Sequence, residues 1–282
     1  MTGAFTNQAG KDSCVLALPQ RKSSGLSIGL GIFVYYHGLC SNRMASQNLT
    51  DNRTGVGEHV AETGDSAFRS ILKNLSHRSR TKKFDLLMSV FRARPEDRVL
   101  DIGASGEVFL QYSLEDVYPF PERIVAGGYE AREIVSARRH YPQPQYALFD
   151  GCALPFPDQS FDLVFSNAVI EHILGPGRQE KFAREIMRVG KNWFVTTPNY
   201  WYPFETHHHL PFFQFLPRPL QMQYNRLLGT HIPKGTVQEL GLLSARQLHR
   251  LFPTSRIVPV RVTFWPETLV AYYIQAERAR PA

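Results

Sequence analysis

Segments with the pattern of strands alternate with segments with the pattern of helices between residues 84 and 196. Phe84, Leu87, Met88 and Phe91 recur at i, i+3, i+4 and i+7, which indicates an amphipathic helix that Pro95 ends. The sequence then predicts buried strands at 98–102, 123–128, 146–149, 161–166 and 193–196, and helices at 107–114, 131–140 and around 182–189. Strands that alternate with helices predict a parallel sheet covered on both faces.

The C-terminal part departs from this alternation. Ser244 and Gln247 form a capping box, which predicts a short helix that Pro253 ends. Two β-rich runs follow, at 256–264 and 268–275, and the short link between them permits an antiparallel hairpin but no helical crossover. We therefore expect an α/β fold with a doubly wound, mostly parallel seven-stranded sheet whose last strand is reversed.

Composition separates the first 65 residues from the rest of the chain. Residues 1–65 are rich in Gly, Ser, Asn and Thr and show no sustained period, so we expect a poorly ordered N-terminal extension, with Met44 as an alternative start. Residues 66–282 are expected to form one domain, with a cap-like insert around 200–240 that is rich in Pro, Phe and Leu.

Charge and cysteine content restrict the partners and the compartment. The formal charge of +7 arises entirely in residues 1–94, but the basic stretch 78–83 lacks interleaved aromatic residues, so a solvated face is favoured over a nucleic-acid partner. The cysteines at 14, 40 and 152 are too scattered for a disulfide framework and predict a cytoplasmic protein, with secretion as the alternative. The apolar run 26–36 is shorter than the roughly 18 residues of a membrane span, so no transmembrane segment is expected.

Polar residues and glycines follow the first predicted strand. In open parallel sheets, ligands bind beyond the carboxyl ends of the strands, so Asp101 and Gly103 are candidate binding residues. A dinucleotide fingerprint would need two further glycines at positions that Ser105 and Val108 occupy. The sequence therefore disfavours a nicotinamide-dependent dehydrogenase.

A second group of motifs begins after the third predicted strand. Asp150 opens the run Asp-Gly-Cys-Ala-Leu-Pro-Phe-Pro, a Phe-Asp-Leu-Val strand follows from Phe161, and the pair Glu171 and His172 comes next. Together with Val-Leu-Asp-Ile-Gly at 99–103, these motifs resemble the class I S-adenosylmethionine-dependent methyltransferases, in particular their small-molecule methyltransferase-like group. The resemblance covers about residues 84–275.

This resemblance implies a cofactor, S-adenosylmethionine, and a set of residues that bind it. Asp101, Gly103 and Ser105 match the loop around the methionine part of the cofactor, and Asp150 matches the acceptor of the adenine amino group. The remaining matches are Cys152 beside the adenine ring, Glu130 at the ribose, and Ser166 and Asn167 facing the sulfonium. Two departures stand out: Ser105 and Glu107 occupy positions where glycine is usual, and Glu130 lies about two residues later than the family's ribose-binding acid.

The acceptor side is expected near the ends of the fourth and fifth predicted strands. Histidine is a natural base near neutral pH, so His172 is the candidate catalytic or acceptor-orienting residue, with a structural hydrogen bond as the alternative. The loop after residue 197 is rich in aromatic residues and histidine, and its candidate acceptor-binding residues are Tyr200, Trp201, Glu205, His207 and His209. In an extended loop the last three would share one face, which could hold a metal or contact an acidic acceptor. Acceptor contact is favoured over a metal, no metal is assigned, and a polar surface loop is the remaining alternative.

The predicted function is methyl transfer to an oxygen or nitrogen atom of a small molecule, lipid or glycan. Methyl transfer is an in-line displacement that requires positioning and exclusion of water, with no covalent intermediate on the protein. The alternatives are a catalytically inactive methyltransferase-like binding protein and, less favoured, an NAD-dependent dehydrogenase.

Overall fold

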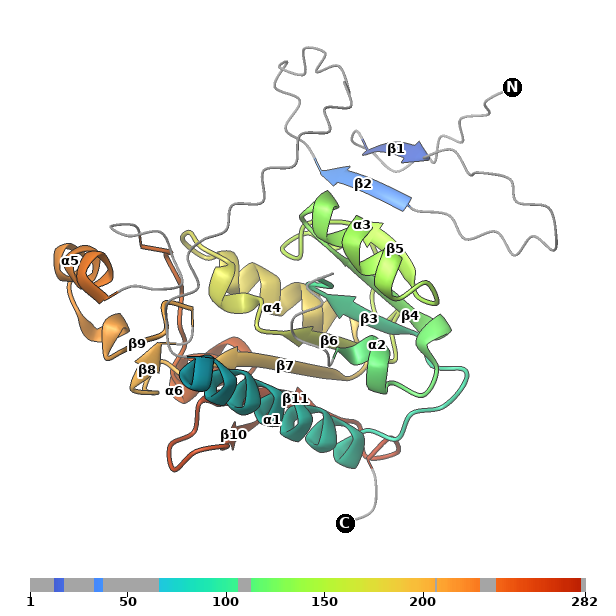
Figure 1. Cartoon of the computed structure of the whole chain (residues 1–282). Helices are drawn as coiled ribbons and strands as arrows, with labels where there is room; N and C mark the ends of the chain where they lie inside the picture. The colour runs from blue at the N-terminus through green and yellow to red at the C-terminus, as the bar shows by residue number, and fades with distance from the viewer. Residues whose placement is uncertain are drawn as a thin grey trace.

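A nine-stranded sheet forms the centre of the protein (Figure 1), seen in a computed structural model that describes residues 13–17, 33–37, 66–105, 113–205, 207–228 and 237–279. The strand order is β1-β2-β5-β4-β3-β6-β7-β11-β10. The strands are β1 Ser13–Ala17, β2 Phe33–His37, β3 Val99–Ile102, β4 Ile124–Gly128, β5 Gln145–Leu148, β6 Leu163–Asn167, β7 Trp193–Pro198, β10 Arg256–Val260 and β11 Thr268–Tyr273.

Seven strands of this sheet, β3 to β7 together with β10 and β11, form the predicted doubly wound sheet. Strands β5, β4, β3, β6 and β7 are parallel, and β11 pairs antiparallel with both β7 and β10. The prediction of a mostly parallel seven-stranded unit with a reversed last strand is confirmed. Strand order reverses at β3, so the carboxyl ends of β3 and its neighbours are where a ligand site is expected.

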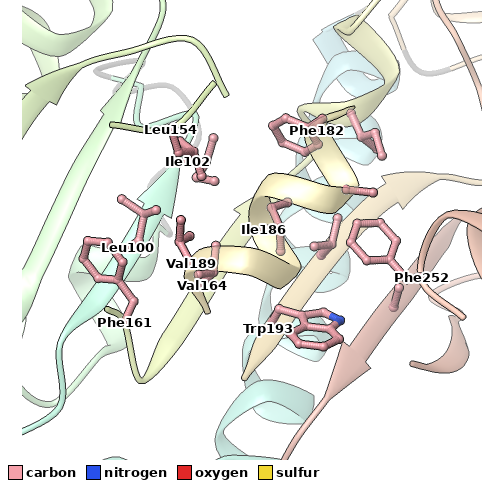
Figure 2. Packing of buried hydrophobic residues seen from close by; sticks show 14 of the residues in the cluster. Leu100, Ile102, Leu154, Phe161, Val164, Phe182, Ile186, Val189, Trp193 and Phe252 are labelled. Atoms are coloured by element: carbon pink, nitrogen blue, oxygen red, sulfur yellow. The ribbon is translucent and has the colours of Figure 1, made fainter. Parts of the chain in front are cut away.

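Helices cover both faces of this sheet and bury its two apolar sides. On one side, Leu100 and Ile102 of β3 pack with Phe182 and Ile186 of α4, which spans Arg178–Val189 (Figure 2). The same cluster includes residues of α6, Ala245–Leu251. On the other side, Val99 joins residues of α1, Ser66–Val90, α2, Leu114–Val117, and α3, Ala131–His140. Successive residues of β3 therefore face two different cores, as a strand buried on both sides requires.

Several boundaries differ from the sequence-based expectations. The first helix, α1, begins well before residue 84. The helix expected at 107–114 falls largely on residues 106–112, which lie outside the described part of the chain, and α2 begins at Leu114. Within residues 1–65 the structure describes only β1 and β2, and β2 pairs in parallel with β5. The expectation of a poorly ordered extension therefore stays a prediction, and Met44 lies outside the described residues.

The segment around 200–240 leaves the sheet after β7. It contains the small hairpin of β8, Phe204–Glu205, and β9, Leu210–Pro211, followed by α5, Arg218–Leu228. Short 3-10 helices lie at Pro121–Arg123, Ile170–His172 and Phe213–Phe215. Among the helices in the described part of the chain, none combines the length and apolar character needed to cross a membrane.

Candidate active site

Glycines line the neighbouring ends of β3 and β4. Gly103 adopts a φ of 97°, and its backbone N–H donates to the Gly127 carbonyl at 2.7 Å. A Cβ added at Gly103 would lie 2.2 Å from a methyl carbon of Val169, so no larger residue fits without movement. A Cβ added at Gly128 would lie 3.7 Å from the Gly103 Cα. Val169 thus packs against Gly103, and the backbones of Gly103 and Gly128 approach each other closely. These two strand ends, here called the glycine surface, remain the predicted place of the cofactor loop.

Asp101 is buried and points towards α2. Burial, together with the charge and hydrogen bond of Glu115, holds the pKa of Asp101 well above its usual range. Two carboxyl groups this close favour a shared proton. The side chain predicted to serve the cofactor loop is therefore engaged with α2 in this structure.

Ser105 and Glu130, the next two predicted cofactor residues, follow β3 and β4 and are exposed. The Ser105 hydroxyl donates to the Glu133 carboxylate of α3 at 2.8 Å. Glu130 occupies the N-cap position of α3 directly after β4, and its side chain is exposed. Each residue follows one of the glycines by two positions in the sequence, and their roles at the methionine and ribose parts of the cofactor stay predictions.

Asp150 follows β5 and already has partners. Its Oδ1 atom accepts from the Cys152 backbone N–H at 2.9 Å, and Nη2 of Arg178 lies 3.3 Å and 3.1 Å from its two carboxylate oxygens. Arg178 begins α4 and was not predicted as a site residue. Burial, and then the charge of Asp150, raise the pKa of the Cys152 thiol, which favours the neutral packing role expected for it.

At the end of β6, Ser166 and Asn167 have different environments. Ser166 is fully buried, and its hydroxyl has no hydrogen-bond partner among the described residues. Oδ1 of Asn167 accepts from Nζ of Lys83 and from Oγ1 of Thr196, both at 2.8 Å. Asn167 is therefore fixed by strand β7 on one side and by helix α1 on the other.

Lys83 is a site residue that the sequence analysis missed. It belongs to the basic stretch interpreted as a solvated face, and that interpretation is wrong for Lys83, which is only 7% exposed. Burial, reinforced by Arg80, lowers the pKa of Lys83 to about 8, although Glu171 and Glu267 oppose the shift. Its position beside Phe84 and Leu87 does not indicate burial, because a lysine next to the apolar stripe of a helix usually extends its amino group into solvent.

A cavity of about 250 Å³ opens at the carboxyl ends of β6 and β7. Its walls come from α1, both strand ends, the loop after β7 and the segment before β11, and its polar lining residues include Lys83, Asn167, Thr196, His207 and Glu267. The lining contains none of the predicted residues at the ends of β3, β4 and β5. The cavity therefore lies on the acceptor side of the candidate cofactor surface.

The loop that contributes to this cavity is folded back on Glu205. The Glu205 carboxylate accepts from the backbone N–H of His207 at 3.0 Å and of His208 at 2.6 Å, and it contacts Nδ1 of both rings at 2.8 Å and 2.6 Å. His209 follows with a φ of 56°, so the three predicted residues do not form the single face of an extended chain. Glu205 is buried behind the cavity wall, whereas His207 and His209 line it.

The charges in this loop stabilise one another. Burial alone would raise the pKa of Glu205, but hydrogen bonds from His207 and His208 bring it well below its usual range. Burial also opposes protonation of His207, yet Glu205 and then Glu171 raise its pKa. His208, which sequence reasoning did not select, is buried, and its Nε2 atom accepts from the Gln238 backbone N–H at 3.1 Å. Nothing in a run of three histidines indicates which of them is structural.

Glu171 and His172 lie in the 3-10 helix beyond β6. The exposed His172 ring packs edge-on against His207, with ring centroids 5.1 Å apart, and burial of part of the ring followed by the charge of His207 lowers its pKa. Glu171 is fully buried, and burial raises its pKa to about 7. Its Oε2 atom accepts from Oγ1 of Thr197 at 3.2 Å. The structure thus brings His172 beside the cavity wall and adds Glu171 to the same corner.

Tyr200 and Trp201 lie away from the cavity. Both rings contact Phe215, with centroids 5.4 Å and 5.9 Å apart, and Trp201 is 58% exposed. Neither residue lines the cavity, whereas Tyr202 and Phe204 do. Tyr202 and Phe204 are thus the aromatic residues of this loop that line the cavity, and an acceptor-binding role for Tyr200 and Trp201 stays a prediction.

Comparison with known proteins finds a family model that is similar to part of this region. A family model described as a methyltransferase domain matches residues 100–192. Two uncharacterized proteins of Mycobacterium tuberculosis, one from each of two strains, are 27% identical over 96 residues, which is 33% of this chain and 33% of each relative. The match therefore spans about a third of the length of these curated relatives.

Solved structures give more extensive but more distant matches. A protein of Pyrococcus horikoshii OT3 is 17% identical, with 74% of this chain and 92% of that chain covered and a TM-score of 0.48. A SAM-dependent methyltransferase from Aquifex aeolicus is 16% identical, with coverages of 72% and 96% and a TM-score of 0.44. The region that the family model matches begins in β3, ends just before β7 and contains Leu100–Gly103 and the motifs that begin at Asp150, Phe161 and Glu171. Residues 100–192 are therefore similar to the methyltransferase domain that the family model describes.

Proposed function

We propose that this protein transfers a methyl group from S-adenosylmethionine to an oxygen atom of a small-molecule, lipid or glycan acceptor. The observation that carries the proposal is the order of features along one sheet edge: the glycine surface at β3 and β4, the carboxylate after β5, and the polar cavity at β6 and β7. This order provides separate places for a nucleoside cofactor and for its acceptor.

In this proposal, the chain binds the cofactor mainly through its backbone and one carboxylate. Gly103 and Gly128 allow close approach of the methionine and ribose parts, and Asp150 accepts from the adenine amino group while Arg178 remains nearby. An ionised carboxylate has enough lone pairs for all these donors. The bound cofactor supplies an activated methyl group, and the contribution of the protein is to position it and exclude water.

The cavity supports an oxygen acceptor over a protonated amine. Lys83 and Arg80 lie in its wall with a single carboxylate, Glu267, so the local charge disfavours an ammonium group. Its volume of about 250 Å³ holds only a small group, since sites that enclose a drug-sized ligand span about 300–1,000 Å³. A larger lipid or glycan would present only its reacting end.

The acceptor's proton is handled at the corner formed by His172 and His207. The Glu205 carboxylate holds Nδ1 of His207, which orients the ring in the manner of a carboxylate-supported histidine. His172 packs edge-on against this ring, with centroids 5.1 Å apart, and is exposed, so a proton would pass from His207 to solvent through a water molecule beside His172. The predicted catalytic role of His172 remains part of this proposal.

Calorimetric titration with S-adenosylmethionine, S-adenosylhomocysteine and NAD tests the proposal. We expect the first two to bind and NAD to be inert. Replacement of Asp150 by Ala removes a charged hydrogen-bond acceptor and should weaken binding by about 10-fold or more. Asp158→Ala is the matched control, because Asp158 is exposed, follows the same motif and pairs with Arg188 instead.

Each other outcome favours a different function. Binding of NAD would support the dehydrogenase, and an absence of heat with all three compounds would support the inactive homologue. If the control weakens binding as much as Asp150→Ala, the assignment of Asp150 fails. A radiolabelled donor added to cell extracts would then identify the acceptor and test the choice of oxygen over nitrogen. A cytoplasmic location remains a prediction from the cysteine pattern.

A further inference from the structure

We propose that Glu171, His172 and His207 bind a divalent metal ion, with zinc as the representative occupant. The metal-ligating atoms of these three side chains all lie within 4.8 Å of one another. Two ligands of a tetrahedral zinc ion are about 3.4 Å apart when each bond is about 2.1 Å long, so binding requires shifts of about 1 Å. Side-chain rotation provides shifts of this size. The sequence predicts no metal at this place, because the residues that it brings together are Glu205, His207 and His209 of one extended loop.

One oxygen of the buried Glu171 carboxylate lacks a partner in the described part of the chain, and a positively charged ion would provide one. Glu171 is fully buried, and its Oε1 atom has no hydrogen-bond partner among the described residues. The other oxygen accepts from Thr197, which fixes the orientation of the group. A buried carboxylate oxygen without a partner is unfavourable, and an ion beside it would satisfy it.

The two histidines complete the ligand set from different segments. Nδ1 of His207 is held by Glu205 at 2.8 Å, so Nε2 is the atom left for a metal. Carboxylates that hold the second ring nitrogen of a ligand histidine are typical of metal sites, because they fix the ring and increase its basicity. His172 packs edge-on against His207 and is exposed, which gives an ion a route of entry from solvent.

The donor set indicates the chemical class of the ion. Two imidazoles and one carboxylate suit zinc and the neighbouring transition metals, whereas magnesium and calcium prefer sites made of oxygen ligands. Three protein ligands leave a position for water or another oxygen ligand. His207 also lines the cavity, so this position would adjoin the proposed acceptor site. Metal binding itself does not depend on the proposed methyl transfer, and an ion bound to both imidazoles would replace their proposed role in proton transfer.

Direct binding measurements on the full chain test the proposal. A tag-free preparation, freed of metal by chelation, is titrated with Zn²⁺ in a calorimeter and with Co²⁺ in a spectrophotometer. We expect one ion per chain and visible absorption bands of tetrahedral Co²⁺. His172→Ala should weaken Zn²⁺ binding at least 10-fold, and it should fold because its side chain is exposed. Thr197→Val removes only the hydroxyl that orients Glu171 and should weaken binding about 10-fold.

His249→Ala is the matched control, because His249 is an exposed histidine on α6, which is not part of the cluster. We expect it to bind Zn²⁺ as the parent protein does. The proposal is overturned if the parent protein takes up no Zn²⁺, or if His172→Ala binds it unchanged. Equal loss in the control and in His172→Ala would identify general surface histidine binding and would also overturn it. None of these results depends on whether S-adenosylmethionine binds.

Discussion

Replacement of Gly103 by Ala should lower the free energy of unfolding through both backbone strain and a steric clash. The backbone of Gly103 has a φ of 97°, which costs an L-residue about 1–2 kcal/mol. The added Cβ would lie 2.2 Å from Cγ2 of Val169, and overpacking of this kind costs about 1–3 kcal/mol. Together these terms predict a loss of about 2–5 kcal/mol in the free energy of unfolding.

Gly175 provides a matched control for the backbone contribution. Its φ is 104°, but the atom nearest to an added Cβ is Cδ of the flexible Arg178 side chain, at 3.3 Å. Gly175→Ala should therefore cost only about 1–2 kcal/mol. Val169→Ala combined with Gly103→Ala should recover about 1–2 kcal/mol relative to the sum of the single changes, because it removes the clash.

Urea unfolding of the four variants, followed by circular dichroism, measures these free energies. Equal midpoints for Gly103→Ala and Gly175→Ala, or strictly additive effects of the Gly103 and Val169 changes, would refute the argument from the Cβ clash.

Two further predictions concern carboxylates near the candidate cofactor surface. The pKa of Asp101 is raised, so its stabilising contribution is present below its ordinary value of 3.8 and is lost as pH rises through the folded-state pKa. Asp101→Asn should therefore flatten the fall in stability between pH 4 and neutrality and stabilise the protein at neutral pH, and an unchanged pH profile of urea unfolding would contradict this. Arg178→Gln should leave S-adenosylmethionine binding within about 5-fold of the parent protein, because its ion pair with Asp150 is partly exposed and worth less than about 1 kcal/mol, and the carboxylate keeps lone pairs for the adenine amino group. A larger loss of binding by calorimetry would instead show that the pair organises the site.

The sheet could be predicted from sequence because each strand is a short apolar run between clear helix and turn signals. Ala131–His140 was placed as observed, and the capping box of Ser244 and Gln247 marks the start of α6. Even the reversed strand followed from the length of a single link. The pairing of β2 with β5 was not predicted, because the glycine- and serine-rich residues around β2 show no period.

Only those residues of the candidate site that directly follow a strand could be predicted from the sequence. Gly103 and Asp150 were selected because parallel strands bring their carboxyl ends to one edge. Lys83 and Arg178 were missed, because their partners lie 84 and 28 residues away and depend on how helices pack on the sheet. The orientation of Glu205 was also missed, because a local turn folds the loop back where an extended chain was assumed.

A crystal structure of the full chain with S-adenosylhomocysteine tests the central claim most directly. The account predicts a nucleoside at the edge formed by β3, β4 and β5, with its adenine amino group within hydrogen-bond distance of Asp150 and its amino-acid part beside Gly103. Density for the compound elsewhere, or Asp150 and Gly103 left in contact only with solvent, would contradict the account.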